Sequence, residues 1–140
     1  MIQKLRSVIL PGGFLPTRAH RGDAGADLRS PVDTIVPAHG SVCIDLLVAI
    51  EIPFGACGLL KSKSGLNVVH DITGEGVIDY GYTGTVRIKL YNHGDEDYHI
   101  HIGDKVTQIL IVPCWIGDFE EVESLEETER GEGGFGSTGR

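Results

Sequence analysis

The feature that most constrains the fold is a two-residue alternation of apolar side chains along much of the chain. Every even-numbered position from 42 to 52 is Val, Ile or Leu, and Pro53 and Gly55 then interrupt the run. A two-residue period places alternate side chains on opposite faces of a β-strand. We therefore expect one half-buried strand over 42–52 and an all-β chain.

Other segments repeat this pattern. Apolar positions alternate over 86–90 and again over 98–102, and turn-forming residues such as Asn92 and Gly94 lie between them, so a hairpin is predicted. The run 108–112 is apolar on both faces and is expected to be an interior strand. Many short strands separated by glycine turns predict a sandwich, a jelly roll or a barrel, because these architectures hide their strand edges.

The composition is that of one soluble domain. The chain has 140 residues, 41% of them hydrophobic, which is enough for a buried core. No apolar run approaches the roughly 18 residues of a membrane-spanning helix, and the first residues do not resemble a signal peptide. Cys43, Cys57 and Cys114 have apolar neighbours and no CxxC spacing. We predict reduced core thiols and a cytoplasmic protein with no membrane partner.

The charge is unevenly distributed. The net charge of −8 excludes general nucleic-acid binding through a basic face. Residues 118–129 contain seven acidic and no basic side chains, so an anionic ligand elsewhere remains compatible with the sequence. We predict a core domain over 1–117, an acidic connector over 118–129 and a flexible glycine-rich arm over 130–140, which has too little apolar surface to order itself.

Two segments have groups that could bind phosphate. The arm contains a GxxxxG pattern but has Ser137 where a P-loop requires lysine, so only a glycine-rich nest of N–H groups is possible there; a plain flexible tail is the alternative. The second segment contains Lys63, Ser64 and Gly65. If Ser64 caps a short helix, the three residues would converge on an anion, whereas the alternative is an exposed turn.

Other candidate residues allow a structural interpretation as well. Asp79 follows an apolar pair and enters a glycine turn with two tyrosines, where an acid is also common for turn geometry alone. His99 and His101 would share one strand face and could bind a metal. Solvent-facing histidines are favoured, because neither a cysteine nor a third histidine lies at suitable spacing. Phe119, Val122 and Leu125 have a helical spacing within the acidic connector, where a solvated segment is expected.

Taken together and in order, five segments resemble the motifs of the trimeric dUTP pyrophosphatase (dUTPase) family. They are Ala24-Gly25-Ala26-Asp27-Leu28-Arg29, Lys63-Ser64-Gly65-Leu66, Gly76-Val77-Ile78-Asp79 with Tyr82 and Gly84, Gly103-Asp104-Lys105-Val106-Thr107-Gln108, and the arm from Arg130 to Gly139. The resemblance implies a dUTPase-like jelly-roll or β-barrel subunit in a homotrimer. Each active site would combine the first, second and fourth motifs of one chain, the third motif of another and the arm of the third.

The resemblance also implies the reaction: with Mg²⁺, dUTP and water would give dUMP and diphosphate, which keeps uracil out of DNA and supplies dUMP for dTMP synthesis. Asp79 would orient the water that attacks the α-phosphorus, Tyr82 would pack under the deoxyribose, and Phe135 would stack on the uracil as the arm closes. Asp27 would contact the magnesium through water, with the metal mainly on the substrate phosphates.

The remaining substrate contacts are also carried over by position. A hairpin over about 68–78 would read uracil through main-chain groups. Phosphate contacts are expected from the second, fourth and fifth motifs. The expected binding residues beyond Tyr82 and Phe135 are Lys63, Ser64, Gly65, Thr73, Val77, Ile78, Lys89, Gln108, Arg130, Gly136, Ser137 and Thr138.

Three positions depart from the family pattern. Lys63 replaces the usual arginine and lacks its bidentate fork, Thr107 replaces alanine, and Glu75 places an acid near the pyrimidine hairpin. Two alternative functions remain. One is a dCTP deaminase of the same fold, although Asp79 and Tyr82 follow the hydrolase pattern; the other is a regulatory protein that senses dUTP and binds a protein partner.

Overall fold

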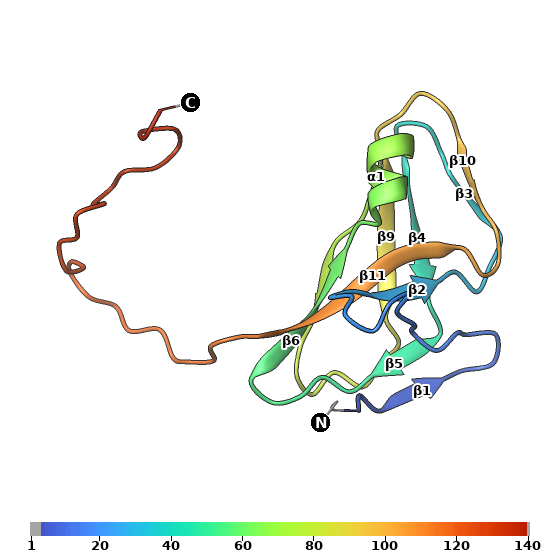
Figure 1. Ribbon diagram of the computed structural model, residues 1–140, viewed down its shortest axis with the longest axis horizontal. Coiled ribbons are helices and arrows are strands. Elements are labelled where there is room, and N and C mark those ends of the chain that lie inside the picture. The colour runs from blue at the N-terminus through green and yellow to red at the C-terminus, as the bar shows by residue number, and fades with distance from the viewer. Residues whose placement is uncertain (1–3, 140) are drawn as a thin grey trace.

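Antiparallel strands form the body of the molecule (Figure 1), which was obtained as a computed structural model that describes residues 4–139. Residues 1–3 of the predicted core and Arg140 of the predicted arm lie outside the described residues. The all-β prediction is confirmed, with one short helix among the described residues. The elements are β1 (Ser7–Ile9), β2 (Ala26–Arg29), β3 (Thr34–Val36), β4 (Ser41–Asp45), β5 (Val48–Ile50), β6 (Ala56–Lys61), α1 (Ser64–His70), β7 (Ile72–Thr73), β8 (Gly76–Ile78), β9 (Arg87–Asn92), β10 (Tyr98–Ile100) and β11 (Lys105–Pro113).

The strands form a four-stranded sheet in the order β2-β11-β6-β8, a three-stranded sheet in the order β4-β9-β7, and the pairs β1-β5 and β10-β3. The core lies between the larger sheets, where Leu60 and Ile109 from one meet Ile44 and Ile88 from the other within a single buried cluster. The predicted interior strand is confirmed, because β11 pairs with β2 on one side and β6 on the other.

The predicted continuous strand over 42–52 is wrong, although its buried positions are as expected. The chain bends at Leu47, which has a φ of 54° and donates its N–H to Asp45 Oδ1 at 3.0 Å. As a result, β4 pairs with β9 while β5 pairs with β1. The even-numbered side chains remain in phase through the bend, and those from Ile44 to Ile52 are buried. The two-residue alternation therefore predicts which side chains are buried, whereas the bend determines which strand each half of the segment pairs with.

The predicted hairpin between 86–90 and 98–102 is also wrong. β9 pairs with β4 and β7, whereas β10 pairs with β3. The buried side chain of Asn92 directs the chain between sheets: its Nδ2 donates to Val36 O at 3.0 Å and Glu96 O at 2.8 Å, and its Oδ1 accepts from Gly94 N. The segment between β9 and β10 is therefore a loop held by the hydrogen bonds of Asn92, and not the tight turn of a hairpin.

The cysteines do not lie in the core as expected. Cys43 is exposed and Cys57 and Cys114 are half-buried, and all three are free thiols. Each cysteine lies on the strand face opposite to the core or just beyond a strand end. Apolar neighbours in the sequence therefore do not indicate that the thiols are buried, because adjacent strand residues point to opposite faces.

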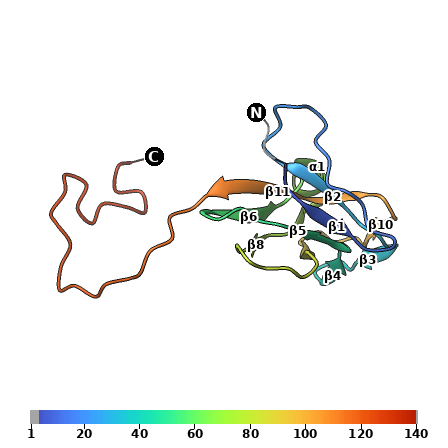
Figure 2. The ribbon, with the colours of Figure 1, turned by 90° about the horizontal axis from the view of Figure 1, so that it is seen from below.

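Residues 114–139 contain no helix or strand and extend away from the sheets in both views (Figures 1 and 2). The apolar side chains of Phe119, Val122 and Leu125 are exposed, as expected for a solvated segment. Within residues 4–139, no helix has the length and apolar character needed to cross a membrane.

Candidate functional site

The candidate site begins with a row of side chains across three strands. Asp27 on β2 is opposite Gln108 on β11, and Gln108 is opposite Lys61 on β6. Asp27 is a buried acid, with only 7% of its side chain exposed. A buried carboxylate is costly unless it is paired, so its partners define the site.

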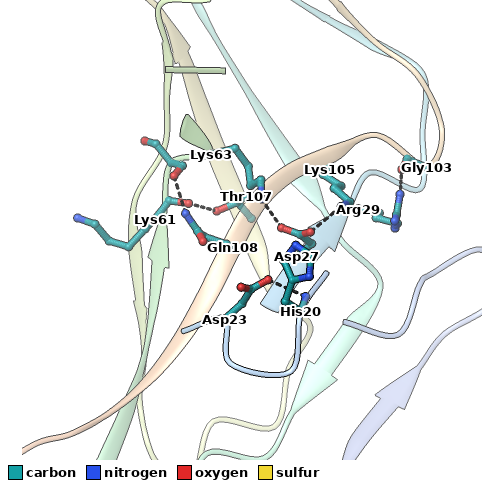
Figure 3. Close-up of polar contacts among 11 residues, drawn as sticks. His20, Asp23, Asp27, Arg29, Lys61, Lys63, Gly103, Lys105, Thr107 and Gln108 are labelled. Carbon is teal, nitrogen blue, oxygen red and sulfur yellow. Dashed lines mark hydrogen bonds and ion pairs between the residues drawn. The ribbon is translucent and has the colours of Figure 1, made fainter. Parts of the chain in front are cut away.

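Two lysines provide this pairing. Lys63 Nζ contacts Asp27 Oδ1, and Lys105 Nζ lies 2.8 Å from Asp27 Oδ2, so the two ammonium groups approach the carboxylate from either side (Figure 3). Burial raises the pKa of Asp27, but hydrogen bonds and charge from Lys105 and Lys63 outweigh it and hold that pKa below its ordinary value. The three groups together carry one net positive charge at neutral pH and are suited to a phosphate oxygen.

The start of α1 differs from the sequence expectation. Lys63 occupies the N-cap position with extended dihedral angles and makes no capping side-chain bond, and Ser64 is the first helical residue. Of the two alternatives that the sequence left open, the helix forms rather than an exposed turn, but Ser64 is not its cap because the chain turns into the helix one residue earlier. Ser64 and Gly65 are exposed beside Lys63, so their polar groups remain accessible to a ligand.

Two further polar contacts join the fourth predicted motif to the end of β6 and the residue after it. Gln108 Nε2 donates to Ser62 O at 3.0 Å, and the buried Thr107 donates its hydroxyl to Lys61 O at 2.9 Å. This bond accounts for threonine at 107, where the family pattern has alanine. Gly25 packs closely beside this row: a Cβ there would lie 2.2 Å from Gln108 Oε1 and would displace the Gln108 side chain.

The predicted hairpin over 68–78 is not formed as expected. Val68 lies in α1, β7 pairs with β9, and β8 pairs with β6, so the chain passes from one sheet to the other at 74–75. Ser62 holds this crossing, because its hydroxyl accepts from Gly74 N at 3.0 Å. Glu75 has a partner as well: Lys61 Nζ donates to Glu75 Oε1 at 2.5 Å.

The other expected uracil contacts surround this crossing. Thr73 Oγ1 lies 2.8 Å from His93 Nε2, and Val77 and Ile78 occupy β8 with Val77 exposed and Ile78 buried. Lys89 lies on β9, and its carbonyl packs against Gly74, where a Cβ would approach to 2.9 Å. Backbone of β7, β8 and β9 thus lies close together.

Asp79 and Tyr82 form a fixed turn. Asp79 is exposed just after β8, and its carbonyl accepts from Tyr82 N at 3.2 Å. The Tyr82 hydroxyl donates to Thr85 O at 2.9 Å, and Gly84 leaves room for the ring, since a Cβ there would lie 2.5 Å from the hydroxyl. The phenol is therefore oriented before any ligand binds.

Within one chain, however, Asp79 is remote from the lysine cluster. Asp79 follows Ile78, which pairs with Gly58, whereas the Asp27 row crosses β6 at Lys61. Three to four residues along a strand correspond to about 10 to 13 Å. The expected catalytic acid and the expected phosphate site are therefore not brought together by a single chain.

The arm residues also lie away from the body (Figures 1 and 2). Arg130 Nε donates to Gly133 O at 3.0 Å, and Ser137 N donates to Gly134 O, so the arm forms local turns. Phe135 is fully exposed with a φ of 50°. Gly136, Ser137 and Thr138 are exposed beside it.

Lys105 is the main residue that the sequence interpretation missed. It lies within the fourth motif, but a register shift between Lys105 and Thr107 breaks the strand period there. Alternation alone therefore does not predict which face Lys105 occupies. The signal that the sequence offered for Lys105 was its charge, since it is a basic residue directly after Asp104 in the fourth motif.

The donor set for a metal is small. The residues from 4 to 139 contain no cluster of three or more His, Cys, Asp or Glu side chains that could hold an ion, and His99 and His101 are exposed. Asp27 accepts from two ammonium groups, which leaves lone pairs for a water but not a free carboxylate. Among the described residues, the Asp27 carboxylate is therefore suited to contact a metal through water rather than as a direct ligand.

Comparison with known proteins gives a consistent result. Residues 13–139 match the family model described as dUTPase. The chain is 42% identical over 133 residues to the deoxyuridine 5'-triphosphate nucleotidohydrolase of Candida albicans, covering 93% of this chain and 84% of that protein. It is 44% identical over 126 residues to the Arabidopsis thaliana protein of the same name, covering 89% and 76%.

Solved structures share the fold. A dUTPase of Staphylococcus bacteriophage 80alpha with dUpNHpp superposes with a TM-score of 0.88 at 29% identity, covering 99% of this chain and all of that one. A dUTPase from phage phi11 of S. aureus, described with a structural Mg(II) ion, has a TM-score of 0.82 at 27% identity and covers 89% of this chain and all of that one. These similarities confirm the predicted dUTPase-like jelly roll.

Proposed function

Because the chain belongs to the dUTPase family, we propose that it hydrolyses dUTP to dUMP and diphosphate, with the Asp27–Lys63–Lys105 cluster at the phosphates and Asp79 at the attacking water. The observation that carries the proposal is the cluster itself: three segments far apart in sequence bring together Asp27, the ammonium groups of Lys63 and Lys105, and Gln108. In the proposal, this face binds the triphosphate.

Lys63 has the main role toward the phosphates. Its side chain is paired with Asp27 and partly buried, so the ammonium is held rather than free to rotate. The exposed hydroxyl of Ser64 and the N–H of Gly65 would donate to the same oxygens, with the Gln108 amide beside them. An ammonium binds phosphate as a point charge, so lysine keeps the charge of the usual arginine without its bidentate geometry.

Asp79 would supply the chemistry. Its exposed carboxylate is suited to accept a proton from water as that water attacks the α-phosphorus, and the bond from phosphorus to the diphosphate oxygen then breaks. Phosphoryl transfer depends on positioning and charge stabilisation, so no nucleophilic side chain is needed. The dCTP deaminase alternative is less well supported, because the curated relatives are named as dUTP nucleotidohydrolases.

We propose that the active unit is a homotrimer with shared sites. Asp79 and Asp27 are separated along β6 within one chain, so in this proposal Asp79 of a neighbouring subunit completes the phosphate site. The extended arm would reach the site of a further subunit.

Recognition of the nucleoside would use backbone and rings. Main-chain groups of Thr73, Val77 and Ile78 would read the uracil edge, with Lys89 at the adjoining strand. The oriented ring of Tyr82 would pack under the deoxyribose. From the arm, Phe135 would stack on the base, while the other arm residues would close over the phosphates; these are Arg130, Gly136, Ser137 and Thr138.

Magnesium would be bound mainly by the substrate phosphates, with Asp27 in contact through water. When bound, the ion would neutralise part of the phosphate charge. Consumption of dUTP would keep uracil out of DNA and provide dUMP for dTMP synthesis. We place this activity in the cytoplasm. The alternative to hydrolysis is a regulatory protein that senses dUTP at this site and binds a protein partner.

The test is a substrate panel. Purified protein with Mg²⁺ is incubated with dUTP, dCTP, dTTP and UTP, and diphosphate and ammonia are measured separately. We expect diphosphate from dUTP alone. Release of ammonia from dCTP would replace the proposal with deamination, and no product from any nucleotide would leave only the binding role.

A further inference from the structure

Cys57 and Cys114 lie on the same outer face of the four-stranded sheet. Cys57 is paired with Val112 across β6 and β11, and Cys114 lies two residues beyond Val112, so the two side chains are diagonal neighbours. The N–H of Cys114 donates to Gly55 O at 2.9 Å, which continues the strand alignment past the last paired residue. Both cysteines are free and half-buried.

The surroundings of Cys57 agree with this placement. Burial raises the pKa of the Cys57 thiol, and the neighbouring Cys114 and then Asp79 raise it further. This effect of Cys114 on the pKa of Cys57 agrees with its diagonal position across β6 and β11. Asp79 directly follows Ile78, the partner of Gly58 on β6, which places its carboxylate next to Cys57.

We propose that Cys57 and Cys114 form a dithiol site that a low-molecular-weight disulfide such as oxidised glutathione converts to an intramolecular disulfide. The thiolate of one cysteine attacks the oxidant, whose S–S bond breaks and releases one thiolate. The second cysteine then attacks the mixed disulfide and releases the other thiolate. The two protons of the cysteines end on these two released thiols, so one disulfide is reduced as the dithiol is oxidised.

The geometry defines what closure requires. Diagonal neighbours on a sheet face have Cα atoms about 7 to 8 Å apart, whereas a disulfide usually spans about 4.4 to 6.8 Å. Closure requires a shift of Cys114, which lies just after the last residue of β11 and is held to Gly55 O by one backbone hydrogen bond, with exposed residues following from Trp115. Closure therefore draws this part of the chain toward β6, on the side where Asp79 lies. The inference does not depend on the proposed hydrolysis.

The experiment uses the reduced full-length protein. It is incubated with oxidised glutathione, remaining thiols are alkylated, and the digest is analysed by mass spectrometry without reduction. We expect a linked peptide pair containing Cys57 and Cys114, two hydrogens lighter than the separate peptides and lost after dithiothreitol. Cys43, which is exposed on β4 in the other large sheet, is the internal control and should carry only glutathione or the alkyl group.

Single variants complete the test. The variant Cys43→Ser should keep the linked pair, whereas Cys57→Ser and Cys114→Ser should each lose it. The proposal is overturned if Cys57 and Cys114 are recovered alkylated, or each with its own glutathione, under conditions that modify Cys43. Equal yields of pairs that include Cys43 would overturn it as well, because they would show random exchange rather than a built site.

Discussion

The ammonium group of Lys105 lies 2.8 Å from the buried carboxylate of Asp27, on the side opposite to Lys63. This pair joins the fourth motif to the first and leaves the acid with partners on both oxygens. Since Asp27 has little exposure to water, the loss of either lysine leaves part of a buried charge without compensation.

The first prediction concerns stability. Lys105→Met should lower the free energy of unfolding by about 1.5 to 3 kcal/mol, the usual range for a hydrogen bond to a charged group. Lys61→Met is the matched control, because the Lys61–Glu75 pair is exposed and should contribute no more than about 1 kcal/mol. Urea unfolding at one protein concentration measures both. Equal losses in the two variants would contradict a special role for the buried pair.

The second prediction concerns pH. The pKa of Asp27 is lowered in the folded state, so its ionised form stabilises the fold at pH values above the ordinary carboxyl pKa of about 3.9. This contribution is lost as the pH falls through the lowered pKa. The stability difference between wild type and Asp27→Asn should therefore be largest near neutral pH and shrink in acid. Asp118→Asn, in the exposed connector, should show no such trend, and a constant difference for Asp27→Asn would rule out this linkage.

The third prediction tests the proposed base. Asp79→Asn should still bind dUpNHpp with Mg²⁺ but lose about 10²- to 10⁴-fold in turnover, because an amide cannot accept the proton. Diphosphate release and calorimetric binding measure the two properties. Asp118→Asn serves as the control and should keep full turnover. Near-normal turnover in Asp79→Asn would remove Asp79 from the mechanism.

The fourth prediction concerns the arm. Trp115 and Phe135 are both fully exposed, so a Trp115→Phe background with Phe135→Trp reports on that one position. Stacking on a base contributes about 1 to 3 kcal/mol, and the fluorescence of this variant should change when dUpNHpp and Mg²⁺ are added. Phe119→Trp on the same background is the control, since that exposed ring lies in the connector. An unchanged signal at saturating analogue would show that the arm does not close over the base.

The fifth prediction tests the shared site. Phe135→Ala chains and Asp79→Asn chains should each be impaired, but mixed trimers should recover part of the turnover. Recovery is expected because some sites in a mixed trimer receive an intact Asp79 and an intact Phe135 from different subunits. Mixed assembly is verified by mass spectrometry of the intact complexes. If verified mixed trimers stay inactive, each site is built within one chain.

The sequence by itself determined the strand faces and the order of the motifs. The alternation from Ile44 to Ile52 marked the buried side chains correctly, since a two-residue period is a local property of extended backbone. The five motifs were sufficient to identify the family because their order and spacing need no three-dimensional information. A short helix after Lys63 was one of two interpretations that the sequence left open, and the structure shows the helix, beginning at Ser64.

Only the tertiary structure decided which strands pair and which charges meet. An alternating apolar pattern identifies a strand but does not depend on which strand it pairs with. The sequence therefore could not show that β9 pairs with β4 rather than with β10. The bend at Leu47, the contact of Lys105 with Asp27 across a register shift, and the approach of Cys57 to Cys114 all depend on packing between segments distant in sequence. Such contacts are selected by the core as a whole, and local residue patterns do not report them.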